Sequence, residues 1–324
     1  MSQELLNENS VVGYLNSRGL ITGDADVEVL TGGVSCVVLA VRTPEKSLVV
    51  KQALPELKVA SVWKADQRRA IVEADAMKLL HSLTPQSVPE LIDLDADTFT
   101  LTMSRLPDSC TNWKLDLLDG VIHQSIGTDL GEILASWHNF GSANSQVRSD
   151  FAEDSLFEQL RVTPFYRAVA DKNDDLATAI AKLIEEVTTV KLTLVHGDFS
   201  PKNILITAEH KPIVLDFEVA HTGNPVFDLA FVSAHLLCKF LRTTDPTIRS
   251  KIRETAINFR NSYLSRSNLE IAPSLAQHVA LIARARVEGV SLVNYLDIEG
   301  QSRVLDLTSR SLKDEDLTFG ELFS

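Results

Sequence analysis

Four oxygen-bearing side chains lie close together in the segment Leu192–Phe231, and each follows or borders a short apolar run. They are Asp198, Asn203, Asp216 and Glu218. Carboxylate and amide oxygens suit a hard cation such as Mg²⁺, and a carboxylate can also accept a proton. Asp and Asn are common in turns as well, for purely conformational reasons. Taken singly, the four residues are explained equally well by turns, but their joint spacing favours a site.

Three short, β-branched runs separate these polar residues and predict buried strands. The runs are Leu192–Val195, Ile204–Ile206 and Ile213–Leu215. We expect the three strands to bring the four polar side chains to one edge of a small sheet.

The part of the chain before this segment predicts a mainly antiparallel sheet with one long helix. Apolar runs bounded by turn residues indicate strands at Asp26–Leu30, Cys36–Val41, Ser47–Lys51, Val88–Leu94 and Thr98–Met103. Helical spacing indicates a short helix at Leu5–Arg18 and the long one at Ala65–Ser82. The proline-containing segment Ser104–Asp108 is the expected boundary, which gives an N-terminal lobe of residues 1–106 and a C-terminal lobe of residues 107–324.

Lys51 ends an apolar strand, where an ammonium group needs a partner. Glu73 lies on the same face of the following helix as Met77 and Leu80, so it could supply the opposite charge. A solvated glutamate at the edge of the helix is the alternative, because that is usual for this residue type.

The turn Thr31-Gly32-Gly33-Val34-Ser35 joins two predicted strands. Glycine lets a backbone approach a phosphate closely, so this turn could present N–H groups to a nucleotide. A Gly-Gly pair is also an ordinary hairpin turn, and alone it is weak evidence.

The C-terminal lobe is predicted to be mostly helical. Helices are expected at Ile122–Phe140, Phe151–Ala170, Asp174–Val190 and Pro225–Lys239, followed by two amphipathic stripes within residues 248–263 and 275–287. His138 is expected to pack or cap, and Asp228, in a first helical turn, can accept backbone N–H bonds. Residues 311–324 are acidic and are expected to be loosely held.

Composition excludes several classes of protein. The chain has 324 residues, 44% of them hydrophobic, and 44 acidic against 31 basic residues give a net charge of −13. That charge argues against broad nucleic-acid binding. Cys36, Cys110 and Cys238 are far apart, which indicates neither a disulfide framework nor a zinc site. We find no signal peptide at the N-terminus and no run long enough to span a membrane, so we expect a cytoplasmic protein. We also expect a monomer or a homodimer.

The order of these parts resembles the protein-kinase motif set: a glycine-containing turn, a strand lysine, a helix glutamate, HGDFSPKN and then an acid-bearing DFE. HGD, DFE and the segment GNPVFDLA are more similar to the aminoglycoside phosphotransferase family and its relatives, the choline, homoserine and methylthioribose kinases. The resemblance extends from Leu30 to about Leu296.

This resemblance implies an α+β, bilobal protein-kinase-like fold and an ATP- and Mg²⁺-dependent small-molecule kinase. Such an enzyme transfers the γ-phosphate to a hydroxyl of a metabolite or an aminoglycoside-like acceptor. Asp198 would accept or orient the proton of that hydroxyl. Asn203 and Asp216 would hold Mg²⁺, and Glu218, in the D-x-E form seen in methylthioribose kinases, would add a metal or water-mediated contact. His196 and Asp228 are expected to support the loop rather than to take part in the chemistry.

The resemblance also implies a nucleotide site. Its residues would be Gly32, Gly33 and Ser35 over the phosphates, Lys51 on the α/β-phosphates with Glu73 holding it, and a hinge at Met103, Ser104 and Leu106 that meets adenine. The loop TGGVSC departs from the family's pattern because it lacks a third glycine, so phosphate coverage is expected to be looser or assisted by side chains.

The sequence says least about the identity of the acceptor and the residues that bind it. The candidate contacts are Lys202, Trp113, Arg284, Arg286, Glu288 and Tyr295. Lys202 could neutralise the transferring phosphoryl group or simply be solvated. Arg284 and Arg286 are two apart on a helix and do not share a face, so one of them is expected to be structural. The net negative charge mildly suits a cationic acceptor such as an amino sugar.

Two other functions compete with the small-molecule kinase. One is a catalytically silent, kinase-like nucleotide-binding protein, although every polar position of the motif is filled. The other is a protein kinase, but GNPVFDLAF follows Asp216 within a few residues and leaves no room for a long activation loop.

Overall fold

The computed structural model describes residues 5–30, 35–55, 66–314 and 316–324. The chain divides into two compact units, Met1–Asp108 and Ser109–Ser324. Each unit has its own secondary structure and core, and each is described separately.

Unit 1 is built on a five-stranded antiparallel sheet with the strand order β1-β2-β3-β5-β4. Its strands are β1 (Asp26–Val29), β2 (Cys36–Arg42), β3 (Ser47–Ala53), β4 (Leu91–Asp95) and β5 (Thr100–Ser104). The central strand β3 pairs with β2 on one side and β5 on the other, with Lys51 opposite Val38 and Leu101. The antiparallel sheet predicted from the alternating apolar runs is thus present.

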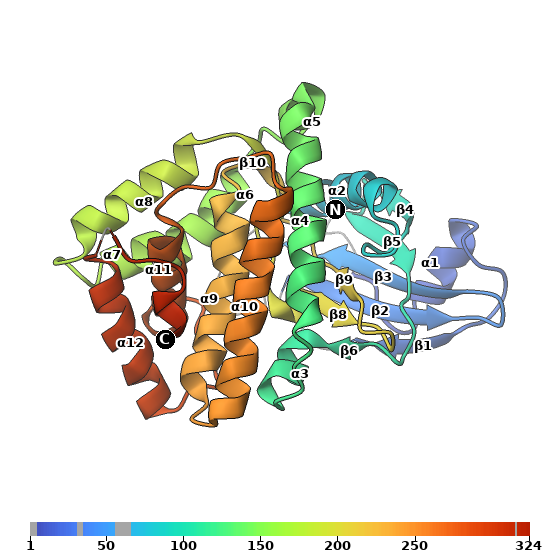
Figure 1. Ribbon diagram of the computed structural model, residues 1–324. Helices are drawn as coiled ribbons and strands as arrows, with labels where there is room; N and C mark the ends of the chain where they lie inside the picture. The colour runs from blue at the N-terminus through green and yellow to red at the C-terminus, as the bar shows by residue number, and fades with distance from the viewer. Residues whose placement is uncertain (1–4, 31–34, 56–65, 315) are drawn as a thin grey trace. The chain divides into compact units, whose positions relative to one another are not determined.

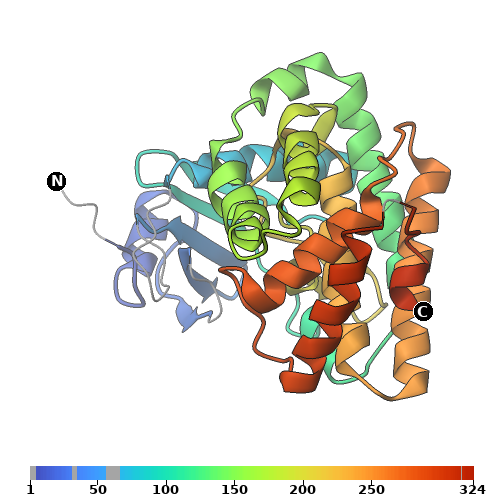
Figure 2. The same cartoon turned by 90° about the vertical axis from the view of Figure 1, so that its left-hand side faces the viewer.

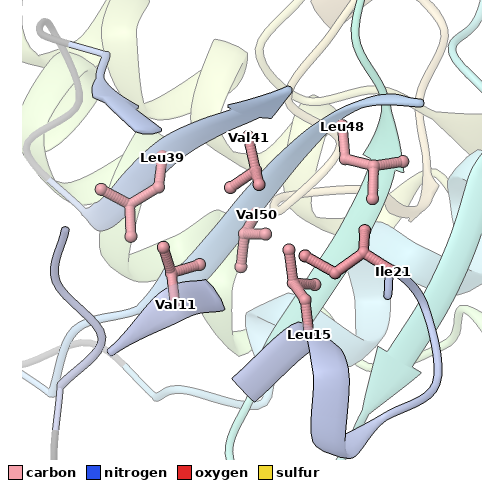
Figure 3. Close-up of a cluster of buried hydrophobic side chains, with 7 residues drawn as sticks. All are labelled: Val11, Leu15, Ile21, Leu39, Val41, Leu48 and Val50. Atoms are coloured by element: carbon pink, nitrogen blue, oxygen red, sulfur yellow. The ribbon is translucent and has the colours of Figure 1, made fainter. Parts of the chain in front are cut away.

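One side of this sheet is covered by the short helix α1 (Val11–Ser17). Val11 and Leu15, one helical turn apart, pack against side chains that alternate along β2 and β3 (Figure 3). The buried members of this cluster are Val11, Leu15, Ile21, Leu39, Val41, Leu48 and Val50. The helix begins at Val11 rather than at Leu5, because its apolar spacing, and therefore its packing, starts only there.

The long helix of unit 1 is α2 (Arg69–Leu83), which contacts β3, β4 and β5. Glu73 is buried on it beside the apolar Met77 and Leu80. The helix therefore carries a carboxylate on the face that packs against the sheet, as its spacing predicted.

Unit 2 is mainly helical (Figure 1). Its helices are α3 (Trp113–Leu118), α4 (Ser125–Ala143), α5 (Ser145–Asp150), α6 (Ser155–Phe157), α7 (Ala168–Ala170), α8 (Ala177–Thr189), α9 (Val226–Arg242), α10 (Pro246–Arg266), α11 (Leu275–Glu288) and α12 (Ile298–Ser311). Helix α9 contacts α10, α11 and α12 and is buried along almost its whole length. The turned view shows α11 and α12, orange-red and red, side by side (Figure 2). The core of unit 2 therefore forms around α9.

Helices α4 and α10 approach each other closely at two glycines. A Cβ atom on Gly127 would lie 2.2 Å from the Thr255 carbonyl oxygen, and one on Gly131 would lie 2.5 Å from the Phe259 carbonyl oxygen. The two backbones are in contact at these positions, so only glycine fits there.

A segment of π-helix, η1 (Glu158–Arg167), connects α6 to α7. The sequence predicted one ordinary helix from Phe151 to Ala170, but Pro164 within it cannot donate a backbone hydrogen bond. Because a π-helix is wider than an α-helix, Arg161 points into the protein interior, where it is only 9% exposed.

The short strands of unit 2 do not form the single small sheet that was expected. One sheet pairs β7 (Thr193–Val195) with β10 (His221–Gly223). The other sheet has three strands in the order β6 (Thr111–Asn112), β8 (Ile204–Ile206) and β9 (Pro212–Val214), and β8 and β9 form a hairpin. The prediction was wrong because short apolar runs give strand positions but not strand partners. Two separate ladders, joined by a loop, position the polar residues.

The end of the chain is better packed than its acidic composition indicated. The 3₁₀ turn η3 (Glu321–Phe323) buries Leu322 and Phe323, and the Phe323 ring lies 5.6 Å from that of Phe240 on α9. The expectation of a loosely held tail is therefore wrong for this segment, because two apolar side chains outweigh its acidic composition.

None of the helices in the described parts of the chain combines the length and the apolar character needed to cross a membrane.

The contact between α4 and α10 can be tested with Gly131→Ala. The added methyl group has to displace backbone, so we expect a loss of about 1–3 kcal/mol in the free energy of unfolding, measured by urea denaturation. Gly320→Ala is the control in the same unit, because a Cβ there meets nothing within 4 Å, and it should change stability by less than about 0.5 kcal/mol. Equal stability of the two variants would contradict the close contact.

The pH dependence of stability should reflect buried histidines. Burial lowers the pKa of His221 from 6.5 to about 4, so the folded protein excludes a proton that the unfolded chain binds. The corresponding stability, at most about 3 kcal/mol, is present above pH 6.5 and is lost as the pH falls towards 4. We expect His221→Gln to flatten the dependence of the melting temperature on pH in this window. His210→Asn, at an exposed position, should keep the wild-type slope. An unchanged slope in His221→Gln would show that His221 is not a source of the effect.

Candidate active site

The candidate site of unit 2 is the loop that leaves β7 and contains His196, Gly197 and Asp198. The backbone N–H groups of His196 and Gly197 donate to the two carboxylate oxygens of Asp228, over 2.6 and 2.9 Å. Asp228 lies in the first turn of α9 and is completely buried. A buried carboxylate with two backbone donors fixes the path of the loop, as expected for Asp228 from the sequence.

Asp228 has a further buried partner. His138 Nε2 lies 3.3 Å from the Asp228 carboxylate, and His138 Nδ1 lies 2.8 Å from the hydroxyl of Tyr263 on α10. Burial alone would raise the pKa of Asp228, but its hydrogen bond with His138 and the nearby His196 outweigh that effect and hold the pKa below its usual value. The carboxylate therefore stays ionised, and it joins the loop to α4 and, through His138, to α10.

Gly197 is required by the shape of the loop. Its φ angle is +75°, and a Cβ atom would lie 2.6 Å from the carbonyl oxygen of Val219. Both the backbone angle and the lack of space exclude other residues. The middle residue of HGD is thus explained by the fold.

His196 links the two polar segments. Its Nδ1 accepts a hydrogen bond from the backbone N–H of Asp198 at 3.0 Å, so its Nε2, 3.1 Å from the Leu215 carbonyl oxygen, carries the proton. Burial lowers the pKa of this imidazole, which agrees with a neutral ring. Because Leu215 precedes Asp216, the ring fixes the spacing between Asp198 and Asp216, a supporting role as expected.

The Asp198 carboxylate is buried, with 2% of the residue exposed, between two cations. Its Oδ2 lies 2.9 Å from Nη2 of Arg161 and 2.9 Å from Nζ of Lys202. Burial would raise the pKa of Asp198, but the charges of Arg161 and Lys202 outweigh it and keep the pKa below its ordinary value. An ionised carboxylate is thus maintained where few water molecules can reach it.

Arg161 was not found from the sequence. Its guanidinium reaches Asp198 from η1, donates from Nε to the Gly197 carbonyl oxygen at 2.6 Å, and lies over the Phe231 ring at 5.5 Å. One arginine in a helix that also contains Arg167 carries no distinguishing signal. Only the π-helical geometry turns it towards the loop.

Asn203 and Asp216 flank the hairpin of β8 and β9. Asn203 donates from Nδ2 to the Asp198 carbonyl oxygen at 3.0 Å, which turns its amide oxygen in the opposite direction. Asp216 is half-buried, has a left-handed backbone with φ of +70°, and is close enough for its charge to oppose ionisation of Asp198. Glu218 follows two positions later and is 7% exposed. The structure therefore brings Asp198, Asn203 and Asp216 together.

In unit 1, Lys51 and Glu73 form the ion pair that the sequence suggested. Lys51 Nζ lies 2.8 and 2.9 Å from the two oxygens of the Glu73 carboxylate. Lys51 is 9% and Glu73 is 1% exposed. A buried pair of this kind is costly to separate, so the lysine position is fixed by the helix.

Of the remaining nucleotide-site candidates, Gly32 and Gly33 fall outside the described residues. Ser35 is partly buried, and its carbonyl oxygen accepts from Arg69 Nη2 at 2.6 Å. Met103 and Ser104 end β5, and Leu106, half-buried, follows them.

The structure places the acceptor candidates in different surroundings. Trp113 is 2% exposed, at the start of α3. Arg284 and Glu288 pair with each other at 2.6 Å, and Arg284 also donates to Asn173 and Ser309, so this pair ties α11 to its neighbours. Arg286 lies on another face of α11, where its charge interacts with that of Asp198. Of the three candidates on α11, Arg286 is the one whose charge interacts with the loop residue Asp198.

Comparison with known proteins identifies the family of the chain. The sequence model of the phosphotransferase enzyme family (APH) matches residues 26–248. The methylthioribose kinase of Bacillus mycoides is 27% identical over 272 residues, which span 73% of this chain and 67% of that protein.

Solved structures show the same fold. A choline/ethanolamine kinase family protein from Mesorhizobium loti superposes with a TM-score of 0.58 at 14% identity, over 96% of this chain and 99% of that one. Spectinomycin phosphotransferase APH(9)-Ia, in complex with ADP and spectinomycin, gives a TM-score of 0.58 at 12% identity, over 97% and 99% of the two chains. The protein-kinase-like fold expected from the motifs is confirmed. The chain belongs to the phosphotransferase enzyme family, a family of small-molecule kinases, and it is itself a phosphotransferase.

Proposed function

We propose that this phosphotransferase uses Mg-ATP to phosphorylate a hydroxyl group of a small metabolite or amino-sugar-like compound, with Asp198 as the residue that orients the acceptor. The observation that carries the proposal is the Asp198 carboxylate, which is buried yet kept ionised by Arg161 and Lys202 at 2.9 Å. Maintaining a buried charge is costly, and a reaction that needs a fixed carboxylate explains it.

In the proposed reaction, the acceptor oxygen attacks the γ-phosphorus of ATP. A new O–P bond forms, the bond from phosphorus to the β,γ-bridging oxygen breaks, and ADP leaves. The hydroxyl proton passes to an Asp198 carboxylate oxygen. In a loose transition state the new O–P bond has hardly formed, so the hydroxyl loses its proton late in the reaction. A carboxylate with a low pKa is therefore a strong enough base to accept that proton. Its main contribution is then to align the hydroxyl for in-line attack.

Lys202 supports the same step. Its side chain is 52% exposed and therefore able to move from Asp198 to a phosphate oxygen. A cation there would offset the charge that develops on the transferring group. The position of Lys202 beside Asp198 favours this role over that of a solvated loop lysine.

Mg²⁺ fits the donors of the loop. The described residues contain no group of three or more His, Cys, Asp or Glu side chains suited to a metal. Magnesium sites of kinases rarely need one, since they use one or two protein oxygens together with phosphate oxygens and water. We propose the amide oxygen of Asn203 and the carboxylate of Asp216 as ligands, with Glu218 as an indirect contact. When bound, the ion would neutralise phosphate charge.

In unit 1 we propose that Lys51 binds the α- and β-phosphates and that Glu73 positions it. Gly32, Gly33 and Ser35 would cover the phosphates, and Met103, Ser104 and Leu106 would contact adenine. The buried Lys51–Glu73 pair supports the first of these roles, because an ion pair costs more to bury than the apolar residues that could replace it.

The first prediction of the proposed function concerns Asp198→Asn. We expect kcat to fall by about 100-fold or more, because an amide neither accepts the proton nor carries the charge that aligns the hydroxyl. The dissociation constant for Mg-ATP should change little, and calorimetric titration measures it. Acceptor-dependent ADP formation gives the rate.

Asp154→Asn is the matched control, since Asp154 pairs with Lys191 in an exposed position of the same unit. It should retain wild-type turnover. Full activity in Asp198→Asn would refute the role of this residue. A wild-type protein that binds Mg-ATP and yet never consumes it would favour a silent binding protein.

The second prediction separates the fold of unit 1 from its function. Lys51→Met leaves the Glu73 carboxylate buried without its ammonium partner, so we expect a loss of about 3–5 kcal/mol in the free energy of unfolding. The double variant Lys51→Met/Glu73→Leu should regain most of that loss, because no charge remains buried there.

Neither variant is expected to bind Mg-ATP with wild-type affinity. Stability is measured by urea denaturation and affinity by calorimetric titration. If the double variant regained both stability and affinity, Lys51 would be excluded as a phosphate ligand.

A further inference from the structure

Basic side chains gather in unit 2 where α9 and α11 face each other. His235 and Lys239 lie one turn apart on α9, and Arg286 lies near the end of α11. Tyr295, from the segment after α11, covers Lys239 with its ring at 5.0 Å from Nζ. We call His235, Lys239, Arg286 and Tyr295 the basic cluster.

Lys239 is the most unusual member of the basic cluster, because it is only 2% exposed. Its Nζ donates to the His235 carbonyl oxygen at 3.3 Å, and in the described part of the chain it pairs with no carboxylate. Burial, followed by the charges of Lys114, Arg286 and Arg242, lowers the pKa of Lys239 to about 7. The Tyr295 ring offers a cation–π attraction, which is weaker than the usual cost of burying an ammonium group.

Arg286 and Tyr295 carry buried polar atoms for which the described residues provide no hydrogen-bond partner. Arg286 donates from Nη1 to Ser291 at 2.8 Å, but its Nε is buried without a hydrogen-bond partner among the described residues. The hydroxyl of Tyr295 is likewise buried and unpartnered within the same residues. Buried polar atoms are normally hydrogen-bonded, so these two indicate a partner that is supplied from outside the chain.

The basic cluster is connected to Asp198 through aromatic rings. Arg161, which pairs with Asp198, lies 5.5 Å from the Phe231 ring, and the Phe231 ring lies 5.3 Å from that of His235. The Phe165 ring lies 5.3 Å from Phe231 and 5.5 Å from the guanidinium of Arg286. These contacts, together with the interaction between the charges of Arg286 and Asp198, place the basic cluster near the proposed catalytic carboxylate.

Other buried cations among the described residues have clear partners. Lys51, Arg161 and Arg284 each pair with a carboxylate within 3 Å, and Arg69 donates to three backbone carbonyl oxygens. Asp198 influences the charge of Arg286, but it already has two partners of its own. Within the described residues, Lys239 and Arg286 therefore form a local concentration of positive charge, in a protein whose net charge is −13.

We propose, on the basis of the function proposed above, that the acceptor carries a negatively charged group, a carboxylate or a phosphate, which Lys239, Arg286 and Tyr295 bind while Asp198 aligns its hydroxyl. An anion there would supply the missing counter-ion and accept the two unused hydrogen bonds. A cationic amino sugar would be repelled by the same side chains.

The experiment compares acceptors matched in size and different in charge. Acceptor-dependent ADP formation is measured with ribose 5-phosphate against ribose and 5-methylthioribose, with D-glycerate against glycerol, and with kanamycin as the cation. We expect kcat/KM for ribose 5-phosphate or D-glycerate to exceed that of its neutral counterpart at least tenfold. Which of the two is preferred distinguishes a phosphate from a carboxylate.

A binding measurement makes the test independent of turnover. The melting temperature is recorded with saturating Mg-ADP, with and without ribose 5-phosphate or D-glycerate, at constant ionic strength set with NaCl. We expect at least one of the two to raise it in the wild type, with a much smaller rise in Lys239→Met and in Tyr295→Phe. Lys211→Met, at an exposed position, should keep the full rise. Without the anion, Lys239→Met should be at least as stable as the wild type, since it removes a buried charge.

The outcomes are distinguishable. A higher kcat/KM for 5-methylthioribose, ribose, glycerol or kanamycin would overturn the anionic acceptor and leave the proposed kinase intact. The absence of any anion-dependent rise in the melting temperature, or an equal rise in Lys239→Met, would overturn it as well. Failure of the wild type to bind Mg-ATP would instead refute the proposed function.

Discussion

The loop around Asp198 depends on the buried carboxylate of Asp228. Two successive backbone N–H groups, of His196 and Gly197, donate to this one side chain. Because Asp228 is part of α9, and α9 is the centre of the unit, the loop is tied to the most buried element of the fold. His138 and Tyr263 extend the same network to α4 and α10. The position of the loop is therefore set by the packing of three helices.

This arrangement allows Asp198 to be both buried and charged. Arg161 and Lys202 provide the compensating charge from different elements, and the Arg161 side chain is buried whereas that of Lys202 is half exposed. The Arg161 guanidinium is held by the Gly197 carbonyl oxygen as well as by Asp198, so it is an integral part of the loop. Lys202 has no such constraint. The charge balance of the site is thus divided between a permanent partner and one that can turn to a substrate.

Much of the molecule could be predicted from the sequence, and the limits have physical causes. The alternating strands of unit 1, the pairing of Lys51 with Glu73 and the supporting roles of His196 and Asp228 follow from local patterns, because each depends on burial or hydrogen bonding near a recognisable motif. The partners of β7 could not be predicted, since strand pairing depends on the whole chain.

Arg161 and Lys239 escaped prediction for another reason. An arginine in a helix and a lysine at the end of one are ordinary surface residues by type, and only three-dimensional packing reveals that they are buried. The net charge of the whole chain mildly suits a cationic acceptor, whereas the side chains around the basic cluster are locally positive and favour the anionic acceptor proposed above. Average charge describes long-range attraction and says little about the few ångströms in which a substrate is bound.

The left-handed backbone of Asp216 has a consequence for how this protein can evolve. A φ of +70° is less favourable for aspartate than for glycine. A glycine at this position would therefore relax the backbone while it removes the carboxylate proposed to bind the metal. Selection for a relaxed backbone alone would favour that variant. If aspartate were retained at this position in a library of variants under selection, its retention would indicate that catalysis, and not folding, was under selection.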